Sequence, residues 1–402
     1  MYEAVLAKEG IWWTGVEDRA TDLFESMWSL PMGVAYNAYV VLGASATAAI
    51  DTVKGPWADE HIHKVERALG GRALDYLVVD HMEPDHAGLV AQMRARWPGM
   101  QIVGNAKTMP MLKGYHGVDG GTIEVADGGS LDLGGRALSF HTVPMLHWPE
   151  SMVTFDSSTG TLFSSDVFGG FGVHEGGLFD DERPRARWEG EMLRYYATIV
   201  ARWSKVAQGA LKKLGTLDIK AIFPSHGTLF RSDPKQVIEL YDRWSRQESE
   251  RGATVVYGSM YGHTRRMAEA VCAGLARAGI AEVRLHDASR DDPSVMLADA
   301  WRWKGLALLS CTYDAGPFPP METFCSKLAG RGIKDRVLGI AGSWSWSKGA
   351  LAALRKFADE TGLDRVGPEP EAYASPTAQD LAQCVELGAA MGERIAATTP
   401  GA

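Results

Sequence analysis

The segment VVDHMEPDHAG, residues 78–88, constrains the fold of this chain more than any other segment. A short apolar run from Tyr76 ends there in four side chains that commonly bind metal ions: His81, Glu83, Asp85 and His86. Because successive side chains of an extended segment point to opposite sides, we expect His81, Glu83 and Asp85 to share one side. A strand that ends in a tight loop would therefore present a cluster able to hold one metal ion or a pair of ions.

Three more ligand-type residues lie farther along the chain, each after an apolar run and so each expected at the end of a strand: His147 in MLHWPESM, Asp166 in TLFSSDVFG and His226 in AIFPSHGTLF. The combined set of four histidines, one glutamate and two aspartates favours iron in a redox role, although zinc accepts the same ligands. Five further histidines fall outside this pattern, and we interpret them as surface or satisfied structural residues: His61, His63, His116, His141 and His174.

The bulk properties limit the class of protein. At 402 residues the chain is too long for one typical core, so we expect two domains. A net charge of −9 argues against general nucleic-acid binding, which needs a basic face. No apolar stretch reaches the roughly 18 residues that span a bilayer, and the start lacks the features of a secretory signal, so we expect a cytoplasmic protein without a membrane partner. The four cysteines form no CxxC pair, which argues against a disulfide framework and a rubredoxin-like iron site.

Residues 1 to about 250 contain short apolar strands that are separated by Gly, Asp and Asn turns, with helices between them. Apolar positions at helical spacing predict helices at Pro56–Leu69, Gly88–Trp97, Gly190–Leu214 and Pro234–Gln247. Strand-rich sheets with covering helices fit an αββα sandwich. The polar segment WSRQESERGA, residues 244–253, is interpreted as a linker.

Beyond this segment strands and helices alternate regularly. The strand ATVVYGS is followed by a helix from Thr264 to Ala278, further strands are expected in AEVRLHDA, GLALLSC and RVLGIAGS, and helices continue from there to the end. Such alternation implies a doubly wound parallel sheet. We therefore expect an α/β protein with domains at residues 1–250 and 253–402.

A short loop rich in hydroxyl groups joins the strand ATVVYG to the next helix: Ser259, Met260, Tyr261, Gly262, His263 and Thr264. These hydroxyls and the free N–H groups at the helix start form a phosphate cradle, and the helix dipole supplies positive potential without a lysine. The loop by itself is also consistent with a well-capped helix. It closely resembles the phosphate loop of flavodoxins.

Two later strand ends carry residue types that suit a flavin ring, at the edge where open α/β sheets bind ligands. Tyr313, Trp344 and Trp346 are alternative candidates for stacking on the isoalloxazine. Without a GxGxxG unit and its ribose-reading acidic residue, FMN fits better than a dinucleotide. The candidate contacts in these loops are Ser310, Thr312, Tyr313, Asp314 and Gly316, then Ser343, Trp344, Trp346 and Gly349.

The order of the ligand residues and the sequence around them, as in MLHWPESM and PSHG, resemble the flavodiiron proteins over essentially the whole chain. The resemblance implies a metallo-β-lactamase-like αββα domain with a diiron site, followed by a flavodoxin-like domain with FMN. It also implies a division of ligands: His81, Glu83 and His147 on one iron, Asp85, His86 and His226 on the other, and Asp166 as the bridge.

Flavodiiron proteins reduce O₂ to water, NO to N₂O, or both, with electrons that pass from a donor to FMN and then to the irons. The resemblance implies the same reaction here, with protons supplied through Tyr195, which takes the place of a pocket tyrosine. Pro31-Met32-Gly33 stands where many relatives have a histidine, so a hydrogen-bond donor near the diatomic is lost and the substrate preference stays open. The third flavin loop is bulkier than in relatives, which is expected to alter the flavin potential.

Two alternatives stay open at this point. One is a zinc-dependent hydrolase of the metallo-β-lactamase fold with an attached flavodoxin module, and the other is a non-catalytic electron carrier or gas sensor with a vestigial metal site. For the leading interpretation we expect a small electron-donor protein such as rubredoxin as partner. We also expect a head-to-tail homodimer, or a tetramer, in which Trp148 lies between the flavin of one chain and the metal site of the other.

Overall fold

The computed structural model describes residues 3–399. Contacts within the chain separate two compact units, Met1–Asp242 and Arg243–Ala402. The division falls inside helix α7, Pro234–Ser245, and the expected domain boundary at residues 250–253 stays a prediction. Among the described helices, none combines the length and the apolar character needed to cross a membrane.

Two mixed sheets form the centre of the first unit. In one sheet the antiparallel strands β1, β2, β7 and β8 are continued by the parallel strands β9, β10 and β11. The other sheet is an antiparallel meander, β12 to β15, to which β16 adds in parallel. The bounds of the first sheet are Val5–Lys8, Ile11–Trp13, Tyr39–Leu42, Thr47–Ile50, Tyr76–Val78, Gln101–Gly104 and Thr122–Glu124, and those of the second are Ser130–Asp132, Ala137–Thr142, Met152–Asp156, Thr161–Phe163 and Ala221–Phe223.

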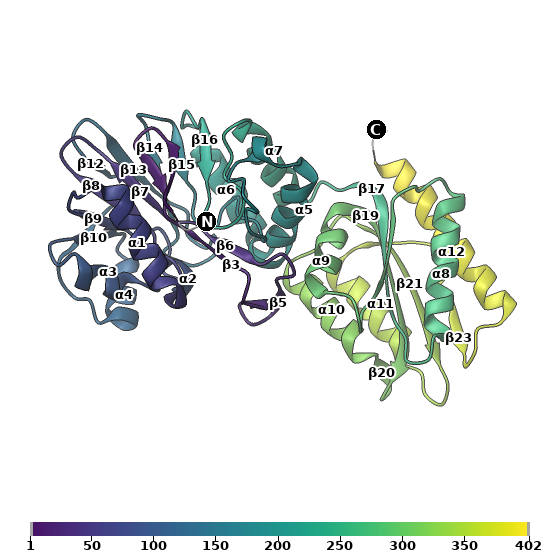
Figure 1. Ribbon diagram of the computed structural model, residues 1–402. Helices are drawn as coiled ribbons and strands as arrows, with labels where there is room; N and C mark the ends of the chain where they lie inside the picture. The colour runs from purple at the N-terminus through teal and green to yellow at the C-terminus, as the bar shows by residue number, and fades with distance from the viewer. Residues whose placement is uncertain (1–2, 400–402) are drawn as a thin grey trace. The chain divides into compact units, whose positions relative to one another are not determined.

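The hydrophobic core of this unit lies between the two sheets, because alternation turns one face of each strand inward. Trp13 and Tyr39 of the first sheet and Phe140, Phe163 and Phe223 of the second belong to one buried cluster. Figure 1 shows α1 to α4 below β9 and β10 and α5 to α7 beside β16, which confirms the αββα sandwich. The helices are η1 Gly55–Trp57, α1 Ala58–Leu69, α2 Pro84–Ala87, α3 Val90–Arg96, α4 Thr108–His116, η2 Asp180–Glu182, α5 Arg185–Tyr195, η3 Tyr196–Val200, η4 Ala201–Trp203, α6 Ser204–Leu214 and α7.

Two small antiparallel ribbons complete the first unit. Strand β3, Val16–Asp18, pairs with β6, Val34–Tyr36, and strand β4, Leu23–Phe24, pairs with β5, Trp28–Ser29. The turn of the second ribbon places Glu25 and Ser26 at positive φ, 50° and 55°. Such a turn is tight enough to aim neighbouring side chains in different directions.

The second unit is a parallel sheet in the order β18-β17-β19-β21-β22, with β20 paired to β19 and β23 to β21. In chain order this is 2-1-3-4-5, the doubly wound arrangement of flavodoxins, so the predicted fold class is confirmed. Helices α8 and α12 cover one face and α9, α10 and α11 the other (Figure 1). The elements are β17 Glu250–Gly258, α8 His263–Arg277, β18 Val283–Asp287, α9 Pro293–Arg302, β19 Trp303–Tyr313, β20 Gly316–Pro317, α10 Pro319–Gly330, β21 Val337–Trp344, α11 Ala350–Thr361, β22 Asp364–Arg365, β23 Glu371–Tyr373 and α12 Ala378–Thr398.

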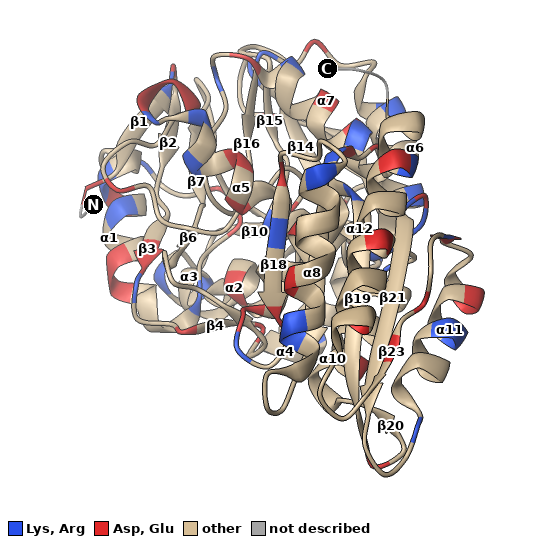
Figure 2. Cartoon of the chain, turned by 90° about the vertical axis from the view of Figure 1, so that its right-hand side faces the viewer, with Lys and Arg blue, Asp and Glu red and all other residues tan. Residues whose placement is uncertain are grey.

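Charged residues of both signs are mixed on the helices of this unit. Figure 2 shows acidic and basic positions side by side on α11 and α12. Several of them pair across short distances, for example Arg355 with Glu369 and Arg394 with Asp364 at 2.5 and 2.6 Å. The negative net charge is therefore not gathered on these two helices.

Three local predictions differ from the structure. The helix predicted over Gly190–Leu214 is continuous but changes geometry in its middle, where the π-helical turn η3 and the 3-10 turn η4 lie between α5 and α6. Strands β22 and β23 lie where only helices were expected. The predicted linker is mostly structured, since α7 ends at Ser245 and β17 begins at Glu250. Gln247, between them, is buried and forms hydrogen bonds with Gly332 and Lys334.

Candidate metal centre and flavin site

The seven predicted metal ligands come from loops that follow strands. His81 and Glu83 follow β9, and His147 lies between β13 and β14. Asp166 follows β15 and His226 follows β16. The expectation for Asp85 is wrong: Pro84 begins helix α2, so Asp85 and His86 are helical and do not continue an extended alternation.

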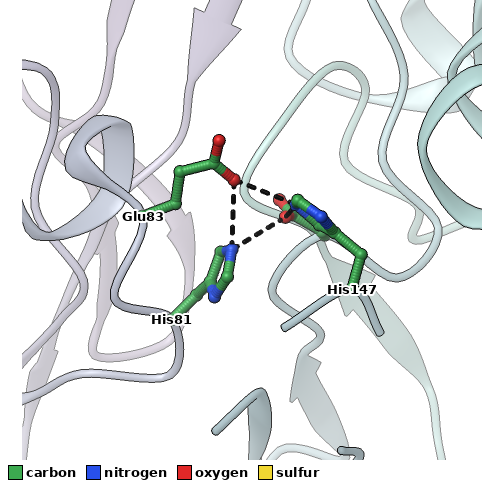
Figure 3. Close-up of side chains that lie close together, drawn as sticks. His81, Glu83 and His147 are labelled. Atoms are coloured by element: carbon green, nitrogen blue, oxygen red, sulfur yellow. Dashed lines mark hydrogen bonds and ion pairs between the residues drawn. The ribbon is translucent and has the colours of Figure 1, made fainter. Parts of the chain in front are cut away.

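The ligand atoms converge in two groups, each within 4.8 Å: His81, Glu83, His147 and Asp166 in the first, and Asp85, His86 and His226 in the second. In the first group the Glu83 carboxylate points toward two imidazoles, with Oε2 2.9 Å from His147 Nε2 and 3.2 Å from His81 Nε2 (Figure 3). In the second group the Asp85 carboxylate lies 3.4 Å from Nε2 of both His86 and His226.

Asp166 lies between the two groups. Its Oδ2 is 3.1 Å from His147 Nε2 and 3.4 Å from His81 Nε2. Its Oδ1 is 3.1 Å from His86 Nε2 and 3.5 Å from His226 Nε2. One oxygen therefore faces each group, which is the arrangement that a carboxylate bridge between two cations needs.

Outer contacts fix the orientation of two of the imidazoles. His81 Nδ1 donates to Glu150 Oε1 at 2.8 Å, and the same oxygen accepts the Met82 N–H at 3.0 Å. His226 Nδ1 donates to the Ala35 carbonyl at 2.9 Å. In both residues Nε2 is thereby left to face the cluster, as in many metal sites where the second ring nitrogen sets the tautomer.

The charges within the cluster oppose and outweigh the effect of burial. Burial disfavours the charged imidazoles, but hydrogen bonds to Glu150 and Glu83 raise the pKa of His81 to about 9. The nearby carboxylates raise the pKa of His86 to about 10. Burial disfavours the carboxylate of Glu83 as well, yet His147 and His81 lower its pKa to about 2. The imidazoles thus hold protons that a bound cation would displace.

The residues present fit a metal centre. Several of their buried polar atoms have no hydrogen-bond partner among residues 3–399: Asp85 Oδ1, Asp166 Oδ1 and Oδ2, His86 Nε2 and His226 Nε2. An unsatisfied buried polar group costs about 1–3 kcal/mol, and more when it is charged. Cations would satisfy these atoms, and imidazole with carboxylate is a donor set that iron and zinc accept.

A cavity of about 230 Å³ lies beside the cluster, and Glu83 and Asp85, one from each group, line it. Glu25, Tyr36 and Lys54 are its other titratable lining residues. Burial and the nearby Glu83 raise the pKa of Glu25. No pattern in the sequence singles out these three residues, because the β4–β5 ribbon, strand β6 and the segment after β8 bring them together.

Tyr195 is fully buried at the end of α5, with its ring centroid 5.5 Å from that of His226. Its hydroxyl has no hydrogen-bond partner in the described part of the chain, and burial raises its pKa well above the usual value. It is beside the ligands but does not line the cavity that Glu25 lines. Met32 lines a different cavity of about 320 Å³, so its position does not support an effect on the diatomic.

Two of the remaining histidines are buried structural residues. His61 Nδ1 donates to the Thr14 carbonyl at 2.9 Å, and His174 Nε2 lies 3.0 Å from Asn37 Oδ1. Burial lowers the pKa of His61 to about 4 and that of His174 to about 3, so both rings are neutral. They are only half satisfied, because the second nitrogen of each ring has no partner among the described residues.

In the second unit a cavity of about 460 Å³ lies at the carboxyl ends of β17, β19 and β21. Most of the predicted flavin contacts line it: Ser259, Met260, Tyr261, His263, Thr264, Thr312, Tyr313, Asp314, Ser343, Trp344 and Trp346. Tyr261 and Trp346 are 87% and 78% exposed, so two aromatic faces are available at its rim. A cavity at a helix start, flanked by aromatic rings, fits a phosphate joined to a planar ring system.

The other predicted flavin residues shape these loops without lining the cavity. Gly262 has φ 88° as the N-cap of α8, and its N–H donates to Ser259 Oγ at 3.0 Å. Ser310 Oγ accepts the Phe318 N–H at 2.9 Å, and Gly316 pairs with Tyr313 in the β19–β20 ribbon. Gly349 packs so closely on the Ala315 carbonyl that a Cβ there would collide with it.

Three lining residues were not predicted: Cys311, Ser345 and Ala374. Cys311, near the end of β19, and Ser345, directly after β21, lie inside segments that were chosen for their aromatic and hydroxyl residues. Ala374 follows β23, a strand that the sequence pattern did not indicate.

Comparisons with known proteins agree with this architecture. The family model described as ODP family beta lactamase matches residues 34–227, and the flavodoxin model matches residues 255–388. The chain is 31% identical to a nitric oxide reductase of Moorella thermoacetica, over 98% of this chain and 100% of the relative. It is 33% identical to a coenzyme F420H₂ oxidase of Methanothermobacter marburgensis, over 96% and 97%.

Solved structures are similar over the same extent. Rubredoxin oxygen:oxidoreductase from Desulfovibrio gigas matches with a TM-score of 0.93 at 25% identity, over 98% of this chain and 99% of that one. The flavodiiron protein from Giardia intestinalis matches with a TM-score of 0.92 at 27% identity, over 99% and 98%. Because both units are matched and the relatives cover nearly the full length of the chain, the chain belongs to the flavodiiron protein family.

Proposed function

We propose that this protein is an FMN- and diiron-dependent oxidoreductase that reduces O₂ to water, NO to N₂O, or both. The observation that carries the proposal is Asp166, whose two oxygens face two separate groups of imidazole and carboxylate ligands. The named relatives, a nitric oxide reductase, an F420H₂ oxidase and a rubredoxin oxygen:oxidoreductase, support the same chemistry. They are oxidoreductases, so a zinc hydrolase is not favoured.

The proposed ligand assignment follows the two groups. His81, Glu83 and His147 hold one iron, Asp85, His86 and His226 hold the other, and Asp166 bridges them. Two ferrous ions held by these residues would supply a site that polarises a diatomic molecule and the electrons for its reduction. Glu150 and the Ala35 carbonyl hold His81 and His226 in the tautomers that expose Nε2 to the metal.

The reaction sets the number of electrons and protons that the site must deliver. Reduction of one O₂ to two waters takes four electrons and four protons, and reduction of two NO to N₂O and water takes two of each. The flavin supplies electrons one at a time when it is bound. The residues that we propose to bind it are those that line the 460 Å³ cavity, with the N–H groups at the start of α8 facing the phosphate.

Two side chains are candidates for proton supply. We propose Tyr195 as the donor, because its phenol is buried beside His226 and burial keeps its proton bound. Glu25 is the second candidate, because its carboxyl lines the cavity at Glu83 and Asp85.

A separate electron-donor protein and a homodimer complete the proposal. The chain carries no CxxC pair, so we propose that electrons arrive from a small carrier such as rubredoxin that docks near the flavin. We also propose a head-to-tail homodimer, or a tetramer built from it, in which Trp148 lies at the junction. The ring of Trp148 is 5.3 Å from that of His81, which supports a place for it at the edge of the metal cluster.

A cytoplasmic location is part of the proposal. It is supported by four free cysteines in the described chain, since secreted proteins usually pair them. Fractionation of cells that express the tagged chain checks this, and recovery in a membrane or extracellular fraction would contradict it.

The function is tested by comparing the wild-type protein with Asp166→Asn in anaerobic NO and aerobic O₂ consumption assays with a reduced donor. Because one carboxylate faces both ligand groups, the variant should lose most of its metal and its turnover. FMN content should be unchanged, since the flavin lies in the other unit. Full turnover by Asp166→Asn would overturn the bridging role, and absence of turnover in the iron- and FMN-loaded wild type would overturn the function.

A further inference from the structure

Asn37 is a buried amide whose N–H groups donate to the loop on either side of His226. It lies in the segment between β6 and β7 and is 1% exposed. Its Nδ2 donates to the carbonyls of Pro224 and Gly227, both at 2.9 Å. Its backbone N–H donates to the Ser225 carbonyl at 2.7 Å. The chain on both sides of His226 is therefore held by a single residue.

The orientation of this amide is fixed by its other contacts. Trp13 Nε1 donates to Asn37 Oδ1 at 2.9 Å, and His174 Nε2 lies 3.0 Å from the same oxygen. Because His174 is neutral and buried, Nε2–H donates and Nδ1 carries no proton. A flipped amide would set its NH₂ against two donors and its oxygen against two carbonyls, so only one orientation is satisfied.

The loop that Asn37 holds also places the imidazole of His226. His226 Nδ1 donates to the Ala35 carbonyl, two residues before Asn37, and the His226 carbonyl accepts the Gly170 N–H at 3.3 Å. A second side chain, Tyr39, donates to the Pro224 carbonyl at 2.7 Å. Tyr39 thus contacts the loop before His226, whereas the Gly227 carbonyl, after His226, accepts from Asn37. Asn37 therefore holds a part of the loop that Tyr39 does not.

We infer that Asn37 is a positioning residue for the His226 side of the metal centre: it sets the loop of residues 224–227 so that His226 Nε2 reaches its metal. This inference rests on the proposed ligand assignment. It concerns one of the two groups, because among residues 3–399 the hydrogen bonds of Asn37 reach neither His81 nor His147. Loss of the amide should therefore weaken binding of one ion and leave the other in place.

The test variant is Asn37→Asp, which keeps the shape and the two acceptor contacts to Trp13 and His174. It replaces the NH₂ with an oxygen that faces two carbonyl oxygens, so the loop must shift. Outer contacts of metal ligands typically change metal affinity by 10- to 100-fold. We expect one of two bound ions to bind about 10- to 100-fold more weakly.

A matched control is Asn105→Asp. Asn105 is also a buried amide of the first unit, 7% exposed, and its Nδ2 donates to the Glu150 carbonyl at 2.6 Å, away from the loop of residues 224–227. The chemical change is identical. Asn105→Asp should leave the metal affinity of the His226 side unchanged.

The measurement is a titration of the metal-free, FMN-loaded chain with Co²⁺, followed by the absorption bands of bound cobalt and by metal analysis. It is carried out on the wild type, Asn37→Asp, His226→Ala and the double variant, with FMN content as a monitor of folding. If Asn37 acts through His226, the two effects are coupled. Asn37→Asp then lowers the affinity for Co²⁺ about 10- to 100-fold in the wild-type background and less than about twofold in the His226→Ala background.

Equal losses in both backgrounds, or no loss in the wild-type background, would overturn the positioning role. A wild type that binds fewer than two Co²⁺ ions would overturn the ligand assignment as well, so the two failures are distinguishable. If Asn37→Asp does not fold, His174→Phe replaces it, because it removes one donor to Oδ1 and leaves the loop contacts in place. It should weaken the same ion by a smaller factor, and unchanged binding there would also overturn the inference.

Discussion

Tyr195 and Glu25 are two residues near the metal cluster whose pKa values are raised by burial. If the phenol supplies protons, Tyr195→Phe should lower kcat by about 100-fold, the usual scale of general acid catalysis, with iron and FMN content unchanged. Turnover of Tyr195→Phe at the wild-type rate, measured with a reduced donor and O₂ or NO, would contradict the role of Tyr195. In that case Glu25→Gln is the variant expected to slow the reaction, because Glu25 lines the cavity at Glu83 and Asp85.

His61, which is not a proposed metal ligand, should make the stability of the protein depend on pH in the acid range. Its folded pKa of about 4 lies below the ordinary value of 6.5, so the unfolded chain binds more protons between these values. Stability should therefore fall as the pH drops from about 6.5 to about 4, by on the order of 3 kcal/mol. His61→Gln keeps a donor for the Thr14 carbonyl and removes the titration. Denaturant unfolding across this range should show a flatter acid slope for the variant, and an unchanged slope would contradict the assignment.

The clustering of the proposed ligand residues could be predicted from sequence, but their immediate surroundings could not. Side-chain type, position after apolar runs and the resemblance in their order indicated seven proposed ligand residues, and the fold brings these seven together. No such sequence pattern indicates Glu25 or Asn37. Their roles arise from contacts between segments far apart in the chain, such as the bond from Asn37 to Gly227, and a pattern along one segment does not contain them.

At the scale of elements, helices α8 and α12 cross at two glycines. A Cβ on Gly388 would collide with the Val271 carbonyl, and a Cβ on Gly274 with the Val385 carbonyl. Since both obstacles are backbone atoms, a change of rotamer cannot relieve them. Gly388→Ala should lower the free energy of unfolding of the flavodoxin-like unit by about 1–3 kcal/mol, the usual cost of overpacking.

The control for this prediction is Gly330→Ala, at the end of α10 in the same unit. A Cβ there meets nothing within 4 Å, so the variant should be unchanged or more stable by up to about 1 kcal/mol. Denaturant titration followed by the release of FMN measures both. Equal losses of stability in the two variants would contradict the close crossing of the helices.

Long strands and helices were predicted from the sequence more accurately than short strands and changes of helix geometry. The alternation of strands and helices indicated the parallel sheet of the second unit, because β17, β19 and β21 each contain a continuous apolar run. Strands β22 and β23 contain only Asp364–Arg365 and Glu371–Tyr373, too short and too polar to show such a run, and they exist because β21 offers its edge for pairing. The change of helix geometry between α5 and α6 likewise has no proline to mark it.

At the scale of the whole molecule, the proposed head-to-tail dimer makes a prediction about mixed chains. Domains of about 250 and 150 residues have radii of gyration of roughly 18 and 15 Å, so sites in separate units of one chain could lie too far apart for fast electron transfer. In a two-fold pair, the flavin of one chain can face the metal site of the other.

The mixed dimer joins a chain that should not bind metal, Asp85→Ala with His226→Ala, to a chain that should not bind flavin, Ser259→Glu with Thr264→Glu. Each parent should be inactive, and the heterodimer, purified by two different tags, should regain one of its two functional pairs. Donor-dependent O₂ or NO consumption is the readout. Heterodimers that form and stay inactive would contradict transfer between chains.

The central claim is that this chain carries a diiron site together with FMN. The most direct measurement is elemental and flavin analysis of the purified protein, expressed with iron and riboflavin in excess. We expect iron near two per chain, FMN near one per chain and little zinc. Two zinc ions in place of iron would contradict the diiron oxidoreductase in favour of a hydrolase, and FMN without either metal would contradict it in favour of an electron carrier.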